Sequence, residues 1–130
     1  MAVAKKEKLV KEIMTKGTKA KALITCGPKH KVADAMKLMV TNKVSGLPVV
    51  DDDGKVVGVI TEADVMTARK TSTVKSAMTA DPISVCADAT IKEACDLLLE
   101  KKIKRALVIK DDGTLWGVVS RTDIIKSMLV

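Results

Sequence analysis

Two short stretches of the sequence place a hydroxyl side chain and an aspartate three residues apart. In GVITEAD these are Thr61 and Asp64, and in GVVSRTD they are Ser120 and Asp123. This spacing is typical of a helix N-terminus, where the hydroxyl accepts a backbone N–H and the carboxylate lies near the positive end of the helix dipole. The same corner can bind a ligand with phosphate and hydroxyl groups, because N–H groups attract anions and carboxylates accept from hydroxyls. The motif alone leaves capping and ligand binding open.

Other residue types offer little material for catalysis or for metal binding. His30 is the only histidine, so we expect neither a catalytic triad nor a histidine-rich metal site, and we interpret it as a surface loop residue. Three cysteines, Cys26, Cys86 and Cys95, include no C-x-x-C pair and cannot all form disulfides, which favours reduced thiols. The sequence also lacks a glycine-rich phosphate loop. We therefore expect a protein that is not an enzyme and has no metal site.

The composition limits the possible partners and the compartment. The chain of 130 residues has a formal net charge of +7, which suits a polyanionic partner such as nucleic acid. One Trp, no Phe and no Tyr count against base stacking, and no helix-turn-helix or zinc pattern is present. The apolar runs are strand-sized, and the opening MAVAKKEK lacks the apolar core of a secretory signal. We expect a cytoplasmic protein without membrane contact.

The two corners belong to an internal duplication. Shifting the chain by 59 residues aligns Ile24 with Ile83 and continues without a gap to Met66 on Ile125. Within this alignment DDDGKVVGVITEAD matches KDDGTLWGVVSRTD, and VADAMKLMV matches IKEACDLLL. The sequence therefore encodes one structural unit twice.

Each repeat predicts the same five elements. Apolar residues recur at helical spacing over 32–40 and 91–99, which predicts an amphipathic helix in each repeat, with Cys95 as a packed thiol on the second. Two apolar runs around an Asp-Gly turn, at Gly54 or Gly113, predict a tight antiparallel hairpin after each helix. The remaining predictions are short strands at 22–25 and 82–85 and second helices at 62–69 and 121–128.

The order of these elements, β-α-β-β-α in each repeat, predicts a mixed α/β (α+β) fold. We divide the chain into a basic N-terminal segment (1–12), a first repeat (13–70) and a second repeat (71–130). A unit of this size has little core of its own, so the two repeats are expected to pack about a pseudo-twofold axis. The two corners would then face one cleft.

The second repeat, MTADPISVCADATIKEACDLLLEKKIKRALVIKDDGTLWGVVSRTDII, resembles the CBS domain, the small repeat named after cystathionine β-synthase. The agreement lies in the leading Met-Thr, the strand before DATI, the Asp-Gly hairpin and the closing Gly-h-h-Ser/Thr-x-x-Asp, where h is apolar. The first repeat is similar, and the resemblance runs from Ile13 to Met128. A tandem pair of this kind is called a Bateman module. The resemblance implies a cleft that binds a regulatory adenosyl ligand (AMP, ADP, ATP or S-adenosylmethionine), and it implies no required cofactor. It also implies that the chain regulates another protein, which the sequence does not identify. Finally, it implies a flat homodimer formed through the second helices.

The resemblance also implies roles for individual residues. Ribose hydroxyls are expected at Asp64 and Asp123, with Thr61 and Ser120 beside them. Adenine is expected against the first strand of a repeat and the start of its hairpin, at Ile24, Ser45, Gly46, Pro48 and Ile83.

Phosphates are expected at the basic pair Lys104 and Arg105. Adjacent strand residues point to opposite faces, so this pair needs a bend at the strand entry to reach one ligand. Ser45 and Gly46 stand in the place of this pair in the first repeat, and we expect one site to dominate. Lys19 and Lys21, in an insertion of five residues in the first repeat, are interpreted either as phosphate contacts or as solvated loop residues.

Three classes of function stay open at this point. The first is the nucleotide-sensing regulatory module, and the second is a basic accessory protein that binds nucleic acid. The third is a structural module for oligomerisation whose ligand sites are vestigial. Retained aspartates at both corners favour the first class over the third, although capping alone also accounts for them.

Overall fold

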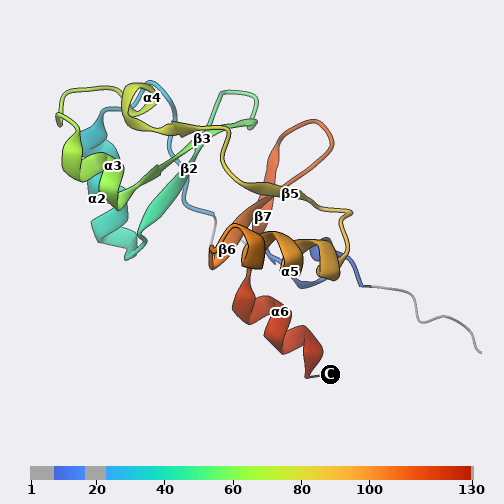
Figure 1. The fold of residues 1–130 in the computed structure, drawn as a ribbon. Helices are drawn as coiled ribbons and strands as arrows, with labels where there is room; N and C mark the ends of the chain where they lie inside the picture. The colour runs from blue at the N-terminus through green and yellow to red at the C-terminus, as the bar shows by residue number, and fades with distance from the viewer. Residues whose placement is uncertain (1–7, 17–22, 130) are drawn as a thin grey trace, which may run out of the picture.

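Two small sheets, each covered by helices, form the two halves of the molecule (Figure 1). The computed structural model describes residues 8–16 and 23–129, so Lys19 and Lys21 lie outside the described residues. One half contains α2 (Val32–Asn42), β2 (Gly46–Val50), β3 (Val56–Thr61) and α3 (Glu62–Thr67). The other contains β5 (Ser84–Cys86), α5 (Ile91–Glu100), β6 (Arg105–Ile109), β7 (Leu115–Ser120) and α6 (Arg121–Met128). The predicted mixed fold with a repeated helix, hairpin and helix is confirmed.

The strand predicted at 22–25 is wrong in its described part, whereas its counterpart in the second repeat forms as β5. Residues 23–25 form no strand, and only Cys26 makes an isolated parallel bridge, to Val49. In the second repeat Leu107 donates its N–H to Ile83 O at 3.4 Å and Ala87 donates to Ile109 O at 2.9 Å. Proline occupies both donor positions in the first repeat, and proline has no N–H to donate. The proline residues at the corresponding positions are Pro48 and Pro28.

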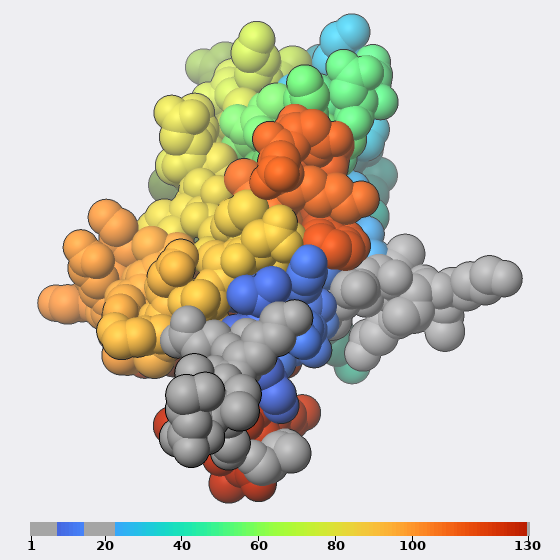
Figure 2. Space-filling view, turned by 90° about the vertical axis from the view of Figure 1, so that its right-hand side faces the viewer, coloured from blue at the N-terminus to red at the C-terminus, as the bar shows by residue number. Residues whose placement is uncertain are grey.

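Each half is completed by a segment that precedes the other half in the sequence. The first such segment contains α1 (Val10–Ile13) and β1 (Thr15–Lys16), and the second contains α4 (Val74–Ala77) and β4 (Thr79–Ala80). Val10 donates to Ala89 O at 2.8 Å, and Val74 donates in the same way to His30 O at 2.7 Å. The strand orders are therefore β1-β7-β6-β5 and β2-β3-β4. Figure 2 shows the N-terminal segment in blue against the beginning of the second repeat in gold.

We call residues 23–80 the first unit, and residues 8–16 with 83–129 the second unit. The division of the sequence into a segment 1–12 and repeats 13–70 and 71–130 stays a prediction. The spatial units have different boundaries, because each contains a short segment that the sequence division assigns elsewhere. Short helices and two-residue strands have too few residues to show a period, so the sequence did not predict α1, β1, α4 or β4.

The tips of the two hairpins join the units. Val56 donates to Gly113 O and Leu115 donates to Gly54 O, both at 3.1 Å. The two bonds are related by the 59-residue shift of the duplication, so the predicted pseudo-twofold relation holds at this contact. Gly54 has φ +80° and Gly113 has φ +87°, a backbone conformation that favours glycine in such turns.

Each unit has its own aliphatic core. Val32, Ala35 and Met39 of α2 are buried in the first, and Ala94 and Leu98 of α5 are buried in the second, as the helical periodicity predicts. Cys95 packs at the edge of the second core, in agreement with its predicted place on the apolar stripe. Among the described residues, no helix has the length and apolarity that a membrane crossing requires.

Candidate functional site

Both predicted corners form capping boxes at the start of a helix. At α3, Thr61 donates its N–H to Asp64 Oδ2 at 2.9 Å, and Thr61 Oγ1 accepts from Asp64 N at 3.4 Å. At α6, Ser120 donates to Asp123 Oδ2 at 2.8 Å, and Ser120 Oγ accepts from Asp123 N at 3.1 Å. No donor in the described part of the chain reaches Oδ1 of either carboxylate. Each aspartate can therefore cap its helix and still accept a hydrogen bond from a ligand.

In the first unit, Ser45 and Gly46 lie directly beside the corner. Gly46 pairs with Thr61 across β2 and β3, and Ser45 O accepts the N–H of Glu62 at 3.0 Å. A Cβ on Gly46 would lie 3.4 Å from Ile60 O, which is tighter than most Cβ contacts. The absence of a side chain therefore leaves the backbone accessible next to Thr61.

Pro48 and Ile24 lie further from this corner. Pro48 is two residues along β2, and its carbonyl accepts from Cys26 N at 3.1 Å. Ile24 packs against the first core as a partly buried side chain. The residues expected to contact adenine in the first unit thus lie on two different segments. Pro48 is in β2, whereas Ile24 is in a segment that forms no strand.

In the second unit, Arg105 stands opposite Ser120 across β6 and β7. Lys104 lies at a bend immediately before β6, and its carbonyl accepts from Arg121 N at 2.9 Å. Both basic side chains are exposed, whereas the next residue, Ala106, is buried. The bend that this pair requires is therefore present, and a shared phosphate contact stays a prediction. Ile83 is 38% exposed beside Leu107.

A shallow depression of about 270 Å³ lies next to Asp123. It is lined by Lys8, Ile13, Asp123, Lys126 and Ser127. Lys8 and Ile13 belong to the N-terminal segment (residues 8–16) that packs against the second unit. This long-range packing explains why the sequence did not predict the two residues near Asp123. Two ammonium groups and a carboxylate at one depression suit a ligand with both anionic and hydroxyl groups.

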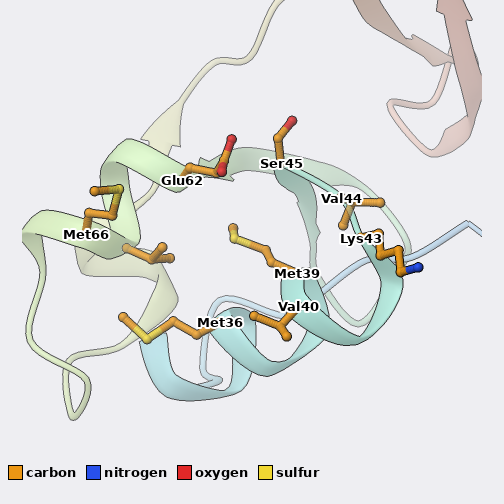
Figure 3. A pocket seen from close by; sticks show the side chains of 9 residues that line it. Met36, Met39, Val40, Lys43, Val44, Ser45, Glu62 and Met66 are labelled. Carbon is orange, nitrogen blue, oxygen red and sulfur yellow. The ribbon is translucent and has the colours of Figure 1, made fainter.

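A larger groove, of about 440 Å³, lies between α2 and α3 (Figure 3). Its lining is mainly aliphatic and sulfur-containing side chains, with Lys43, Ser45 and Glu62 at its rim. Ser45 is the only predicted site residue that lines it. This groove is therefore a separate feature from the corners.

Two other groups of side chains have distinct chemistry. Burial raises the pKa of the Cys26 thiol to about 11, which keeps it protonated at neutral pH. The ligand atoms of Cys86, Asp88 and Asp111 lie within 4.8 Å of one another near the surface. Asp88 accepts from Lys11 Nζ at 2.8 Å, so an ion pair already balances one of these carboxylates.

Comparison with known proteins gives consistent family assignments. A family model of the CBS domain matches residues 10–71 and 74–130. An inosine-5'-monophosphate dehydrogenase from Methanocaldococcus jannaschii is 37% identical over 107 residues, covering 82% of this chain and 22% of the dehydrogenase. An uncharacterized 17.7 kDa protein from Acidianus ambivalens is 33% identical over 106 residues, covering 78% of this chain and 65% of that protein. The chain thus spans only about a fifth of the length of the dehydrogenase.

Solved structures of CBS-pair proteins superpose on nearly the whole of this chain. CBSX2, a CBS-pair protein from Arabidopsis thaliana solved in complex with AMP, has a TM-score of 0.80 and 31% identity, covering 93% of this chain and 96% of that one. The CBS domain pair of protein MJ0100, in complex with 5'-methylthioadenosine and S-adenosylmethionine, has a TM-score of 0.75 and 26% identity, covering 95% and 97%. On the family match and these structures together, the chain belongs to the CBS-domain family and carries two CBS repeats.

Proposed function

We propose that this protein is a regulatory module that binds an adenine nucleotide at the corners formed by Asp64 and Asp123. The observation that carries the proposal is the open Oδ1 of each aspartate, because a ribose diol needs two hydrogen-bond acceptors or an acceptor with two lone pairs. The AMP complex of CBSX2, at 31% identity, supports the ligand class. The complex of the MJ0100 domain pair extends that class to S-adenosylmethionine.

The second-unit corner is proposed as the stronger site for di- and triphosphates. Lys104 and Arg105 stand beside it, whereas Ser45 and Gly46 occupy the equivalent positions in the first unit. Lys8 and Lys126 add two more cations near Asp123. Charge-assisted hydrogen bonds to phosphate are about twice as strong as neutral ones, which favours a phosphorylated ligand at this corner.

The proposed activity is regulation of another protein, with no reaction catalysed by this chain. The match to the dehydrogenase covers 22% of that enzyme, so its activity is not transferred to this protein. Two copies are proposed to pair through the second helices α3 and α6. Apolar side chains exposed on these helices include Met66, Ile125 and Met128.

The test is a thermal-shift and calorimetry panel of AMP, ADP, ATP, NAD and S-adenosylmethionine on the purified chain. A ligand at a hundred times its dissociation constant should stabilise the protein by about 2.7 kcal/mol. The proposal requires at least one adenosyl compound to do so. Salt-sensitive RNA binding without any nucleotide response would favour the nucleic-acid alternative. No binding of either kind, with a stable oligomer, would favour the structural module with vestigial sites.

A further inference from the structure

Each unit has an equivalent contact between its short helix, α1 or α4, and the segment before its long helix, α5 or α2. In the second unit Lys11 donates its N–H to Ala87 O at 3.0 Å. In the first unit Lys75 donates its N–H to Pro28 O, also at 3.0 Å. The 59-residue shift of the duplication places Pro28 on Ala87, so Lys75 is the counterpart of Lys11.

The charges at these two contacts differ. In the second unit Lys11 Nζ forms an ion pair with Asp88 Oδ1 at 2.8 Å. The 59-residue shift places Lys29 at the position of Asp88, so the first unit has two lysines, Lys29 and Lys75, where the second has an ion pair. Both lysines are exposed, and neither forms a salt bridge within the described part of the chain. Because like charges repel, an anion between these two positions would be stabilised.

Further cations lie around these two lysines. Lys70 O accepts the N–H of Ala33 at 3.1 Å, so the loop between α3 and α4 lies against the start of α2. Figure 1 shows this region of α4 at the opposite end of the molecule from α6. We call its exposed cationic side chains the basic face: Lys29, Lys31, Arg69, Lys70 and Lys75.

Little negative charge balances the basic face. Its own segments contain one acidic residue, Asp34, whose Oδ2 accepts the N–H of Lys31 at 3.0 Å. Asp51, at the nearby end of β2, accepts two N–H groups of its own hairpin turn through Oδ1. Residues 28–34 and 69–76 thus have a net charge of +4, with His30 neutral.

The second unit shows that this excess of charge is not required by the fold. Residues 28–34 and 72–76 contain three basic residues and one acidic residue. The equivalent residues 87–93 and 8–12 contain three of each. The same backbone contact is therefore formed with balanced charges in one unit and with a positive excess in the other.

The basic face is entirely polar at its surface. Val32 and Val74, the apolar residues beneath it, are fully buried. No large apolar side chain is exposed, and no aromatic residue occurs, among residues 28–34 and 69–76. A partner protein is usually anchored by aromatic or aliphatic side chains in pockets, and a membrane-surface helix inserts an apolar face. The basic face therefore suits a partner that is recognised through anionic groups alone.

We propose that the basic face binds the phosphate backbone of duplex nucleic acid, independently of base sequence. A duplex presents closely spaced phosphates, which several cationic side chains contact together with release of counterions. Single strands are held largely by stacking on aromatic side chains, and this face has none. Exposed hydroxyls at Thr71 and Ser76 supply additional donors for phosphate oxygens. No residue of the basic face is a proposed nucleotide ligand, so this function goes beyond the nucleotide site and does not depend on it.

Lys29→Asp tests the proposal because it recreates the ion pair of the second unit. The new carboxylate should pair with Lys75 as Asp88 pairs with Lys11, so the variant should melt normally while losing two phosphate contacts. Fluorescence anisotropy with a labelled DNA duplex, at salt concentrations from about 50 mM upwards, measures the affinity. The slope of log K against log salt should become shallower by about 2 for Lys29→Asp and by about 1 for Lys29→Ala. At about 0.1 M salt each lost contact should weaken binding about eightfold.

Lys102→Asp is the matched control, with the same change of charge on an exposed lysine of the second unit. It precedes Lys104 and Arg105, so it also tests whether that basic stretch binds the duplex. Its effect should be about twofold or less, because exposed charges are screened over about 8 Å at physiological ionic strength. An effect equal to that of Lys29→Asp would mean that the duplex responds to overall charge, and would overturn the assignment to the basic face.

The choice of probe distinguishes the classes of partner. A DNA duplex and an RNA duplex should bind with similar affinity, because only phosphates are contacted. Binding of the RNA duplex alone would overturn a contact made through phosphates only. Tighter binding of polyglutamate would indicate an acidic protein partner, and binding only to vesicles of phosphatidylserine and phosphatidylcholine would indicate a membrane surface. Either result, or no duplex binding at low salt, would overturn the proposal.

Calorimetry of AMP on the same proteins reports the nucleotide site separately. The affinity of Lys29→Asp for AMP should equal that of the wild type, and a parallel loss would overturn the independence of the two sites. Absence of AMP binding with intact duplex binding would refute the proposed nucleotide function and leave the basic face assigned.

Discussion

Lys55 and Thr114 form the antiparallel bridge at which the two units meet. Backbone hydrogen bonds on either side of this bridge, each 3.1 Å long, join the hairpin tips through Gly54 and Gly113. Because the bonds are between backbone groups, the contact does not depend on the side chains of the two turns. The segments with α1 and β1 and with α4 and β4 add a second connection. The first of them precedes the first unit in the sequence but packs in the second unit, and the other precedes most of the second unit but packs in the first. The two corners are thus carried by units that share backbone at several points.

The first prediction concerns the exchanged segment at β4. Gly58→Ala should lower the free energy of unfolding by about 1–3 kcal/mol, the usual cost of overpacking. A Cβ at this position would lie 2.6 Å from Met78 Sδ and 2.8 Å from Thr79 O. The methionine side chain can move, but the Thr79 carbonyl is part of the β3–β4 contact. Urea denaturation measures the change.

Gly27→Ala is the matched control for this prediction. A Cβ there would meet its nearest neighbours at 3.8 Å, an ordinary van der Waals distance. Its stability should stay within about 0.5 kcal/mol of the wild type, as for most surface changes. Equal stability of the Gly58 and Gly27 variants would show that β4 does not constrain residue 58.

The second prediction separates ligand binding from capping at the corners. Asp123→Ala should weaken ATP binding by about 1.5–3 kcal/mol, the range for a hydrogen bond to a charged group. Asp64→Ala should have its main effect on the first-unit site. Titration calorimetry on folded protein measures both affinities.

Thr90→Ala is the capping control. Thr90 Oγ1 accepts from Glu93 N at 3.1 Å at the start of α5, and Thr90 is not one of the proposed ligand residues. Its loss should lower stability by about 1 kcal/mol, as typical caps do, without changing nucleotide affinity. If the Asp64 and Asp123 variants behave like the Thr90 variant, the two aspartates are caps only.

The third prediction assigns Arg105 to phosphate. Arg105→Ala should reduce affinity for ATP and ADP much more than affinity for adenosine, because the ribose and adenine contacts are left in place. Raising the salt concentration should produce part of the same loss, since exposed charges are screened over about 8 Å at physiological ionic strength. Calorimetry with the three ligands gives the comparison. Equal losses for ATP and adenosine would instead assign Arg105 to the fold or to the base pocket.

Lys102→Ala provides the reference for a general loss of positive charge. Lys102 is exposed in the turn after α5 and is not one of the proposed ligand residues. Its effect on ATP affinity should be small compared with that of Arg105→Ala. An equal effect would indicate that ATP responds to overall charge and not to a local contact.

The fourth prediction follows from the buried thiol of Cys26. Burial raises its pKa from 9.0 to about 11, so the folded protein keeps the proton at pH values where the unfolded chain has lost it. Below about pH 9 both states hold a neutral thiol and this group adds no pH dependence. Between about pH 9 and 11 the unfolded state binds fewer protons, so the free energy of unfolding falls as pH rises.

Cys26→Ala should remove this part of the decline. All other titratable groups are the same in the two proteins, so the difference between the two pH profiles isolates the thiol. Urea denaturation at several pH values from 8 upwards gives the profiles. Parallel profiles for wild type and variant would contradict the assigned burial effect.

The sequence by itself determined the features that depend on neighbouring residues. The 59-residue duplication, the apolar stripes of α2 and α5, and the turns at Gly54 and Gly113 are visible as local patterns. The corners at Thr61 and Ser120 are local as well, because a capping box is formed within four consecutive residues.

Only the tertiary structure decided which surfaces meet. The exchange of segments 8–16 and 72–80 between units has no periodic signal, because each contains only one helical turn and two strand residues. The positions of Lys8 and Lys126 beside Asp123 follow from that exchange. The position of Lys75 beside Lys29 follows from it as well. Periodicity shows that a face is apolar, but long-range packing determines whether that face is covered, and by which segment.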